Sequence, residues 1–313
     1  MDIQSLYEKK YSDGSYVYSV ADIARRLDIL PDTLRKTIQN APYYVCPRKV
    51  GKAPDLIAND WNAIIEAIRS TAIPVNVDRS EPVPSDSYLL IPLNDLHMGS
   101  MTFDDYRDTQ DRILDLIDEG HKEIIIWLGG DLFDTDNLRG TTSRGTYIGK
   151  TDWPTAWGDL SKLVLPIIAA AYKKSKVEVI MSRGNHSESM EWAFCQYLKA
   201  AFPKVPIDDG LDYIKARLLG NTFLGFSHGN KRMDNLAVNL SKIYRQLWGE
   251  ASHYEMIVGH EHKEYKVDGI LLRRMPSPAI PNEWSEEEMF AIEHQCLMCL
   301  QYGEHGVESV RYV

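Results

Sequence analysis

The stretch YLLIPLNDLH, residues 88–97, decides the fold class, because a run of apolar residues stops abruptly at a carboxylate and an imidazole. The same arrangement returns in EIIIWLGGDLFD (123–134), VEVIMSRGNH (177–186), FLGFSH (223–228) and MIVGHEH (256–262). Each apolar run has the length of a buried strand and is shorter than a typical helix. Helical patterns follow the first four of these segments, at 105–118, 155–174, 188–200 and 234–248. This alternation of strands and helices predicts an α/β protein.

Three strand pairs complete the expected sheets. Each pair surrounds a turn signal that contains glycine. The pairs are 213–219 with 223–227, 264–267 with 270–274, and 296–302 with 307–312. Parallel segments joined by helices, together with such hairpins, predict a layered fold with mixed sheets.

The composition excludes several broad classes of protein. Of the 313 residues, 44% are hydrophobic and 26% are charged, which is typical of a globular chain and excludes disorder, collagen and coiled coil. Its apolar runs are far shorter than the roughly 20 residues that span a bilayer, so we expect no membrane partner. No signal peptide is visible, and the four scattered cysteines are interpreted as reduced thiols, so we expect a cytoplasmic protein.

The first 72 residues have a different texture and are predicted to form a separate helical domain. Residues 19–27 and 32–39 have the capping residues and apolar spacing of two short helices joined by a turn, which is the helix-turn-helix pattern. Thr33, Arg35, Lys36 and Gln39 would face outward, where they suit contacts with DNA. An ordinary helical hairpin is the alternative. Three prolines mark residues 73–87 as a linker, which leaves 88–313 as a second, larger domain.

The chemistry is expected where the strands end. In open α/β sheets, ligands bind beyond the carboxyl ends of the strands. Seven nitrogen and oxygen donors would converge there: Asp95, His97, Asp131, Asn185, His228, His260 and His262. The pairs Asp95/His97 and His260/His262 are spaced two residues apart, which in an extended backbone puts both side chains on one face.

The donor types indicate which metals fit. Carboxylate, amide oxygen and imidazole without thiolate favour Mn²⁺, Fe or Zn²⁺. Seven donors exceed the needs of one tetrahedral ion, whereas two ions about 3.5–4 Å apart that share a carboxylate would use them all. We therefore expect two divalent ions, with Mn²⁺ first among the candidates.

The ordered blocks D-x-H, G-D-x-x-D, G-N-H, a lone H and G-H-x-H resemble the calcineurin-like metallophosphoesterases over residues 88–275. The resemblance implies a four-layer α/β/β/α sandwich that hydrolyses phosphate esters. It assigns Asp95, His97 and His262 to one metal, Asn185, His228 and His260 to the other, and Asp131 to the bridge. His186 would protonate the leaving oxygen as a catalytic residue. Within the superfamily the chain looks most like phage and bacterial members related to the SbcD/Mre11 nucleases.

Two departures from the family pattern affect the site. Ser187 follows G-N-H where Asp or Glu is common, so the residue that orients His186 is left open. Asp134, which we predict to be catalytic, stands where the SbcD/Mre11 nucleases have His, and Thr135-Asp136 follow it where phosphoprotein phosphatases have Arg-Gly. The second block therefore fits neither subgroup.

The substrate is predicted from the charges near these blocks. Arg183 precedes G-N-H and could touch a substrate phosphate, with a surface position as the alternative. Arg139 and Arg144 lie in a polar loop that could grip a phosphodiester backbone, with a disordered loop as the alternative. The net charge of −10 means that any contact with nucleic acid is local or assisted by metal. We expect phosphodiester hydrolysis in nucleic acid, with DNA as a partner. A nucleotide phosphodiesterase, a phosphomonoesterase and a DNA-binding regulator with an inert domain are the alternatives. A homo-oligomer is left open.

Overall fold

The computed structural model describes residues 3–8, 20, 23–24, 27, 31–39, 41, 73–81, 84–230, 235–259, 265–267, 269–279 and 295–313. The chain divides into two compact units, residues Met1–Glu66 and Ala67–Val313. The larger unit holds two sheets, and each is described below.

The first sheet is mixed and has the strand order β11-β10-β1-β2-β3-β4. Its parallel centre consists of β1 (Tyr88–Leu93), β2 (Glu123–Leu128) and β3 (Lys176–Met181), which are paired in register along their whole length. The short β4 (Ile207–Asp208) extends this centre, and the antiparallel hairpin of β10 (Met298–Gly303) and β11 (Gly306–Tyr312) closes the other edge. The parallel pairing brings the carboxyl ends of β1, β2 and β3 to one edge of the sheet.

The second sheet has the strand order β5-β6-β7-β9-β8. The hairpin of β5 (Lys215–Leu219) and β6 (Thr222–Ser227) is antiparallel, and β7 (His253–Val258) pairs in parallel with β6 and with β9 (Ile270–Arg274). β8 (Tyr265–Val267) forms the far edge. Because β6 and β7 run in parallel, residues 228 and 259 lie next to each other beyond their ends.

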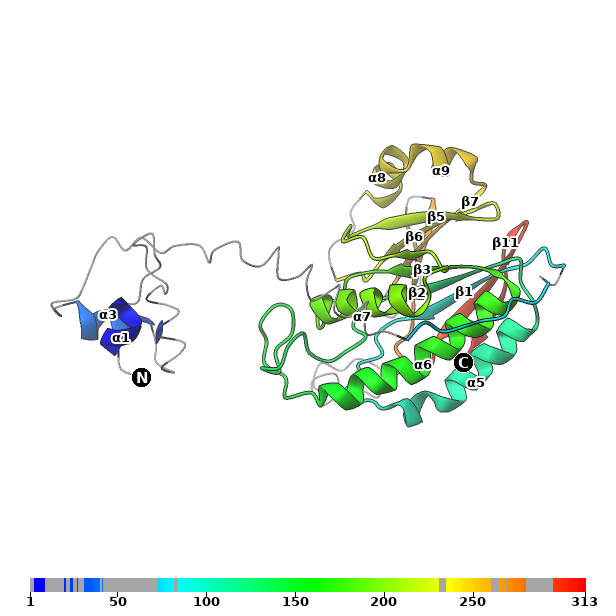
Figure 1. Ribbon diagram of the computed structural model, residues 1–313. Coiled ribbons are helices and arrows are strands. Elements are labelled where there is room, and N and C mark those ends of the chain that lie inside the picture. The colour runs from blue at the N-terminus through cyan, green and yellow to red at the C-terminus, as the bar shows by residue number, and fades with distance from the viewer. Residues whose placement is uncertain are drawn as a thin grey trace. The chain divides into compact units, whose positions relative to one another are not determined.

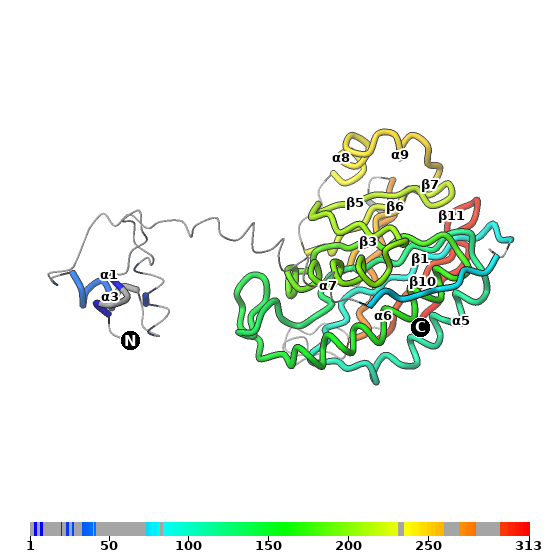
Figure 2. Tube along the Cα trace, viewed as in Figure 1, coloured from blue at the N-terminus to red at the C-terminus, as the bar shows by residue number. Residues whose placement is uncertain are grey.

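Helices cover the outer face of each sheet, which gives the four layers α/β/β/α (Figures 1 and 2). On the first sheet lie α5 (Arg107–Asp118), preceded by the short 3-10 helix η1 (Phe103–Tyr106), together with α6 (Trp153–Lys174) and α7 (Glu188–Ala201). On the second lie α8 (Leu236–Ile243) and α9 (Arg245–Glu250). The expected fold class is confirmed.

Side-chain alternation along the strands explains why two sheets stack. On β2, Ile124 and Ile126 pack toward α5, α6 and α7, whereas Ile125 and Trp127 pack toward Phe226 and the second sheet. A strand with apolar residues on both faces must be covered on both sides. The strands that precede the metal-ligand candidates are therefore closely packed on both faces and form a rigid support for them.

The smaller unit shows two short helices, α1 (Ile3–Glu8) and α3 (Pro31–Ile38), within its described residues. Tyr7, Ile23, Ala24, Leu34 and Ile38 are buried together and form its core. Thr33, Arg35, Lys36 and Gln39 are exposed on or just beyond α3, as the apolar spacing predicts. The basic turn at 48–52 and the expected third helix at 61–68 lie outside the described residues.

Part of the predicted linker is attached to the larger unit. Val75 N donates a hydrogen bond to Ala201 O (2.8 Å), and Ser80 N donates one to Lys173 O (3.0 Å). Arg79 reaches Ser175 O (2.9 Å). Residues 73–81 thus run along the ends of α6 and α7.

Two elements differ from expectation. The helix expected at 234–248 is broken into α8 and α9 at Tyr244, whose backbone leaves the helical region (φ −111°, ψ 45°) while its hydroxyl donates to Ile214 O (2.5 Å). The strand β4 was not expected, because two residues carry no periodicity. Among the helices the structure describes, none is long and apolar enough to cross a membrane.

Candidate metal centre

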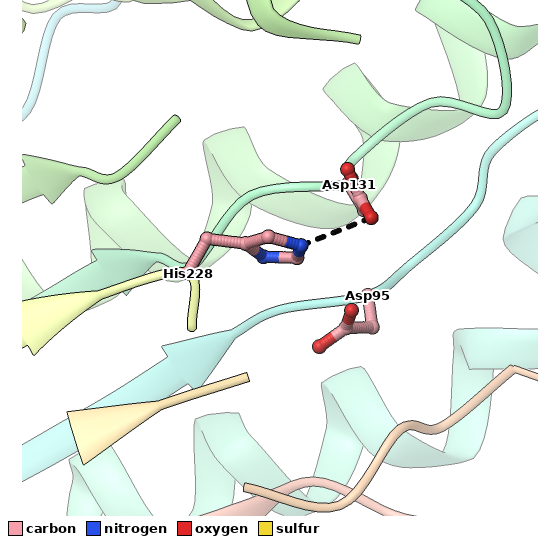
Figure 3. A group of neighbouring side chains, drawn as sticks. All are labelled: Asp95, Asp131 and His228. Atoms are coloured by element: carbon pink, nitrogen blue, oxygen red, sulfur yellow. Dashed lines mark ion pairs between the residues drawn. The ribbon is translucent and has the colours of Figure 1, made fainter. Parts of the chain in front are cut away.

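Three predicted ligands from three different strands converge beyond the strand ends. Asp95 follows β1, Asp131 follows β2 and His228 follows β6, and one ligand atom from each lies within 4.8 Å of the others (Figure 3). All three side chains are buried. His228 Nε2 lies 3.1 Å from Asp131 Oδ2. Two carboxylates and an imidazole that face one another in a buried space form a donor set that suits a divalent cation.

The backbone at these ligands is left-handed. Asp95 has a φ of 51°, His97 of 49° and Asp131 of 51°, which together make up three of the four described non-glycine residues with positive φ. Such conformations cost about 1–3 kcal/mol and persist where the surroundings over-determine them. The expectation that Asp95 and His97 share a face of an extended strand is therefore wrong in its reasoning, because tight turns aim these side chains.

Glycines allow the loops to approach one another closely. A Cβ on Gly130 would lie 2.7 Å from Gly184 N and from His228 Nδ1, and the φ of Gly130 is +89°. A Cβ on Gly184 would lie 2.2 Å from Asp131 Oδ1. The glycines that precede Asp131 and Asn185 are thus required by these close contacts.

The protonation of His228 is set by its two partners. Its Nδ1 lies 2.9 Å from Gly129 O, and a carbonyl only accepts, so Nδ1 carries a proton and Nε2 faces the site. Burial lowers the pKa of His228, but Asp131 outweighs this effect and the pKa rises to about 10. Burial raises the pKa of Asp131, but the charges of His228, His186 and His97 outweigh burial and lower the pKa well below its usual value. Asp131 therefore stays ionised. A cation would take the place of the His228 proton.

Two asparagines stand beside this group. The Oδ1 of Asn185 lies 3.2 Å from His228 Nε2, which places the predicted ligand at the edge of the cluster. Asn94 donates from Nδ2 to Asp95 Oδ2 (2.8 Å) and to Pro276 O (3.2 Å). Asn94 thereby holds one carboxylate oxygen of Asp95 in place.

His97 is oriented by Asp134. Its Nδ1 lies 3.4 Å from Asp134 Oδ1, and the Asp134 carboxylate also accepts hydrogen bonds from the N–H and hydroxyl of Ser100. Burial lowers the pKa of His97, but its hydrogen bond to the Asp134 carboxylate and the charges of Asp131, Asp134 and Asp95 raise it overall. A carboxylate on one ring nitrogen directs the other toward a metal.

His186, the predicted general acid, lies against His97 and is held by main-chain atoms. The two rings meet edge to face with their centroids 4.9 Å apart. His186 N donates to Asp131 Oδ1 (2.7 Å), and its Nδ1 lies 3.1 Å from Asp134 O. That carbonyl fixes the proton on Nδ1 and leaves Nε2 for the substrate. The structure thus offers an orienting group for His186 where the sequence left one open.

His260 and His262, the remaining predicted ligands, lie outside the described residues. The residue before them does lie at the site: a Cβ on Gly259 would come within 2.5 Å of Asp95 Oδ2. The chain therefore lies against the Asp95 carboxylate directly after the end of β7.

The predicted substrate-binding arginines lie on segments that adjoin the ligand-bearing loops in sequence. Arg183 Nη1 donates to Glu188 Oε1 (2.7 Å), and its buried Nε has no hydrogen-bond partner among the described residues. Arg139 and Arg144 are exposed on the loop that follows Asp131. Ser143 N, next to Arg144, donates to His186 O (2.9 Å). The structure thus ties this loop to the histidine and leaves its arginines in solvent.

Sequence reasoning missed Glu191, Ser187 and Asn94 as members of the site. All three are fully buried beside ligand-bearing loops. The spacing of Ser187 and Glu191 puts them on one face of α7. That spacing was the only sequence signal for the pair.

The model of the calcineurin-like phosphoesterase family matches residues 91–292, and the chain belongs to this family. It is therefore a metal-dependent phosphoesterase, as the five blocks predict. No curated protein sequence matches the chain significantly.

Three solved structures are among those to which the chain shows similarity. Vacuolar protein sorting 29 from Cryptosporidium parvum is 12% identical (TM-score 0.36) over 73% of this chain and 98% of its own. A novel archaeal phosphodiesterase is 12% identical (0.34; 72% and 98%). Yfce, a phosphoesterase from E. coli, is 15% identical (0.33; 71% and 98%). At these scores the structures add nothing to the family assignment.

The described residues fit a divalent ion. Asp131 and His228 form a buried ion pair, and Asp95 brings a second carboxylate into the same space. Two buried carboxylates so close together need a cation between them. His228 meets this need in part through its proton, and a metal ion would meet it fully.

Proposed function

We propose that the protein is a two-metal phosphodiesterase that acts on nucleic acid, with Mn²⁺ as its ion and His186 as its general acid. The observation that carries this proposal is the convergence of Asp95, Asp131 and His228, with Asn185 and His186 at the same edge. Divalent ions held there supply Lewis-acid stabilisation of the phosphoryl oxygens and an acidified water.

The chain's own groups account for the remaining steps. His186, protonated on Nε2, donates that proton to the leaving oxygen, while Asp134 O keeps Nδ1 in place. The carboxylate of Asp134 faces His97 instead of the substrate, so in this proposal Asp134 is a positioning residue. Arg183 directly precedes Gly184, and its side chain, 26% exposed, would offer its guanidinium to a phosphate oxygen.

A basic loop, residues 137–151, supports nucleic acid as the substrate. It carries Arg139, Arg144 and Lys150 and no acidic residue, in a chain whose net charge is −10. Tyr147 and Leu138 on the same loop are 67% and 82% exposed. Cations that follow a phosphate backbone, together with an exposed aromatic ring that can stack on bases, are features of single-strand binding.

The basic loop and the residue before it are anchored by hydrogen bonds to the start of α7 and to His186. Ser143 Oγ accepts a hydrogen bond from Glu188 N (2.9 Å), and Asp136 accepts from Ser189 N (2.6 Å) and Met190 N (3.2 Å) at the start of α7. Within the loop, Thr142 N donates to Thr146 O (2.8 Å). Arg144 is thereby held one residue from the hydrogen bond to His186.

Two synthetic substrates test the reaction class. With Mn²⁺, turnover of bis-p-nitrophenyl phosphate should exceed that of p-nitrophenyl phosphate. Faster monoester hydrolysis would make the protein a phosphomonoesterase, and no turnover despite bound Mn²⁺ would indicate an inert domain. His186→Gln should lower kcat by about 10²–10⁴-fold, the usual contribution of a general acid, while Mn²⁺ content stays unchanged.

Labelled single- and double-stranded DNA, with and without Mn²⁺, tests the substrate. We expect Mn²⁺-dependent cleavage, faster on the single strand. Arg144→Ala should weaken DNA binding and reduce the salt slope by about one. Arg245→Ala is the matched control, because Arg245 is exposed on α9 in the other helical layer and the charge change is the same. Equal effects of the two variants would count against the basic loop.

We further propose that the N-terminal unit holds DNA through the exposed side of α3. Deletion of residues 1–66 follows the boundary between the two units and keeps residues 73–81, which are bonded to α6 and α7. The truncated protein should keep its turnover of bis-p-nitrophenyl phosphate and lose DNA retention. Unchanged retention would assign a different role to the unit.

A further inference from the structure

Glu191 joins two of the ligand-bearing loops through a buried carboxylate. It lies in the first turn of α7 and has no solvent exposure. Its Oε1 accepts a hydrogen bond from Leu132 N (3.1 Å), and its Oε2 accepts one from Gly184 N (2.9 Å). Leu132 follows Asp131, and Gly184 precedes Asn185. One side chain therefore holds the main chain on both sides of the gap between the β2 and β3 loops.

Ser187 completes this connection, which we name the Glu191–Ser187 clasp. Ser187 Oγ donates to Glu191 Oε1 (2.8 Å) and accepts from Phe133 N (3.1 Å). The loop after β2 is thus tied at two successive N–H groups. The serine that departs from the family pattern has a defined place in this network.

The clasp explains how Asp131 keeps an unfavourable conformation. A non-glycine residue with a φ of 51° persists only where its neighbours over-determine it. The N–H of the next two residues is held by the clasp, and Asp131 Oδ1 is held by His186 N (2.7 Å). Gly184 also packs closely against both groups, since a Cβ on it would lie 2.3 Å from Asp131 N and 2.8 Å from Glu191 Oε1.

We infer that Glu191 is a positioning residue that sets the spacing between the Asp131 loop and the Asn185–His186 loop. This spacing lets side chains from the loops after β2 and β3 bind the same ions. The inference rests on the proposed function only in taking Asp131 and Asn185 as ligands. A purely structural carboxylate would stabilise the fold and leave the ion affinity of the folded protein unchanged.

Glu191→Gln in the full-length protein tests the inference. The amide nitrogen of the new glutamine would replace one carboxylate oxygen, and it donates hydrogen bonds but cannot accept them. At least one of the two loops therefore loses its hydrogen-bond acceptor. We expect Mn²⁺ affinity, measured by titration calorimetry, to fall about 10–100-fold, as is usual when a group supporting a metal ligand is lost. On bis-p-nitrophenyl phosphate at saturating Mn²⁺, kcat should fall while KM stays near the wild-type value. Ser187→Ala should show the same effects more weakly.

Glu255→Gln is the control. Glu255 is also a buried carboxylate, held on β7 by Arg273 (2.7 Å) and Tyr302 (3.1 Å). This variant should lower the Tm and leave Mn²⁺ affinity unchanged.

Wild-type Mn²⁺ affinity in a folded Glu191→Gln protein would overturn the inference. If that variant does not fold, unchanged affinity in folded Ser187→Ala overturns it instead. Because the isotherms need no turnover, a wild-type protein that binds Mn²⁺ but cleaves no phosphodiester would refute the proposed function and still leave the clasp tested.

Discussion

Gly184→Ala places a single methyl group where the loops after β2 and β3 touch. The added Cβ would lie 2.3 Å from Asp131 N and 2.2 Å from Asp131 Oδ1, whereas ordinary contact begins at 3.4 Å. Going from 2.3 Å to 3.4 Å requires a displacement of about 1.1 Å, and the obstructing atom belongs to the backbone, so no rotamer change relieves it. A misplacement of about 1 Å can cost roughly 10²-fold in rate.

We therefore expect Gly184→Ala to lower kcat on bis-p-nitrophenyl phosphate by about 10²-fold and to weaken Mn²⁺ binding. Gly158→Ala on α6 is the matched control, because its Cβ would meet no atom within 4 Å. In a helix this change should stabilise the protein by roughly 0.5–1 kcal/mol and leave kcat unchanged. Calorimetric Mn²⁺ titration, steady-state kinetics and Tm would be measured on both proteins. A Gly184→Ala protein with kcat within about twofold of wild type would refute the reasoning on loop spacing.

Three further predictions concern ion binding, packing of the core and the loss of folding stability at acidic pH. Mn²⁺ should raise the Tm of the wild-type protein by mass action, and His228→Ala should abolish that rise; an equal rise in both would place the ion elsewhere. Phe133→Ala removes a buried ring packed against neighbouring aromatic side chains, and urea unfolding should show a loss of about 3–5 kcal/mol, whereas an unchanged midpoint would contradict the packing. Burial raises the pKa of Asp208, but Lys215 and Arg217 outweigh it and lower the pKa from 3.8 to about 2. This contribution to the free energy of unfolding is present above pH 3.8 and is lost as the pH falls through about 2. Asp208→Asn should therefore make the free energy of unfolding fall less steeply between these two pH values. A mutant curve parallel to that of wild type would argue against the ion pairs.

The strands could be predicted because their pattern is local. Residues 88–93 and 124–128 are apolar runs that stop shortly before Asp95 and Asp131, and β1 and β2 span Tyr88–Leu93 and Glu123–Leu128. The break between α8 and α9 could not be predicted in this way, because Tyr244 leaves the helix to reach Ile214 O on a distant segment. Tertiary hydrogen bonds of this kind leave no periodic trace in the sequence.

The candidate site shows the same division. Its convergence was predictable, because parallel strands bring their carboxyl ends to one edge. The aim of each side chain was not, since Asp95 and His97 adopt left-handed turns that the extended-strand argument excludes. Glu191 was missed because its partners, Leu132 and Gly184, are remote in sequence or lack a side chain to signal the contact.

The central claim is that Asp95, Asp131 and His228 surround cations. Crystals grown with Mn²⁺ and measured at the manganese absorption edge test it directly. The account predicts anomalous peaks at bonding distance from these three side chains, as two ions about 3.5–4 Å apart that share Asp131. An anomalous map with no ion among the three residues, or with manganese bound only elsewhere, would contradict it.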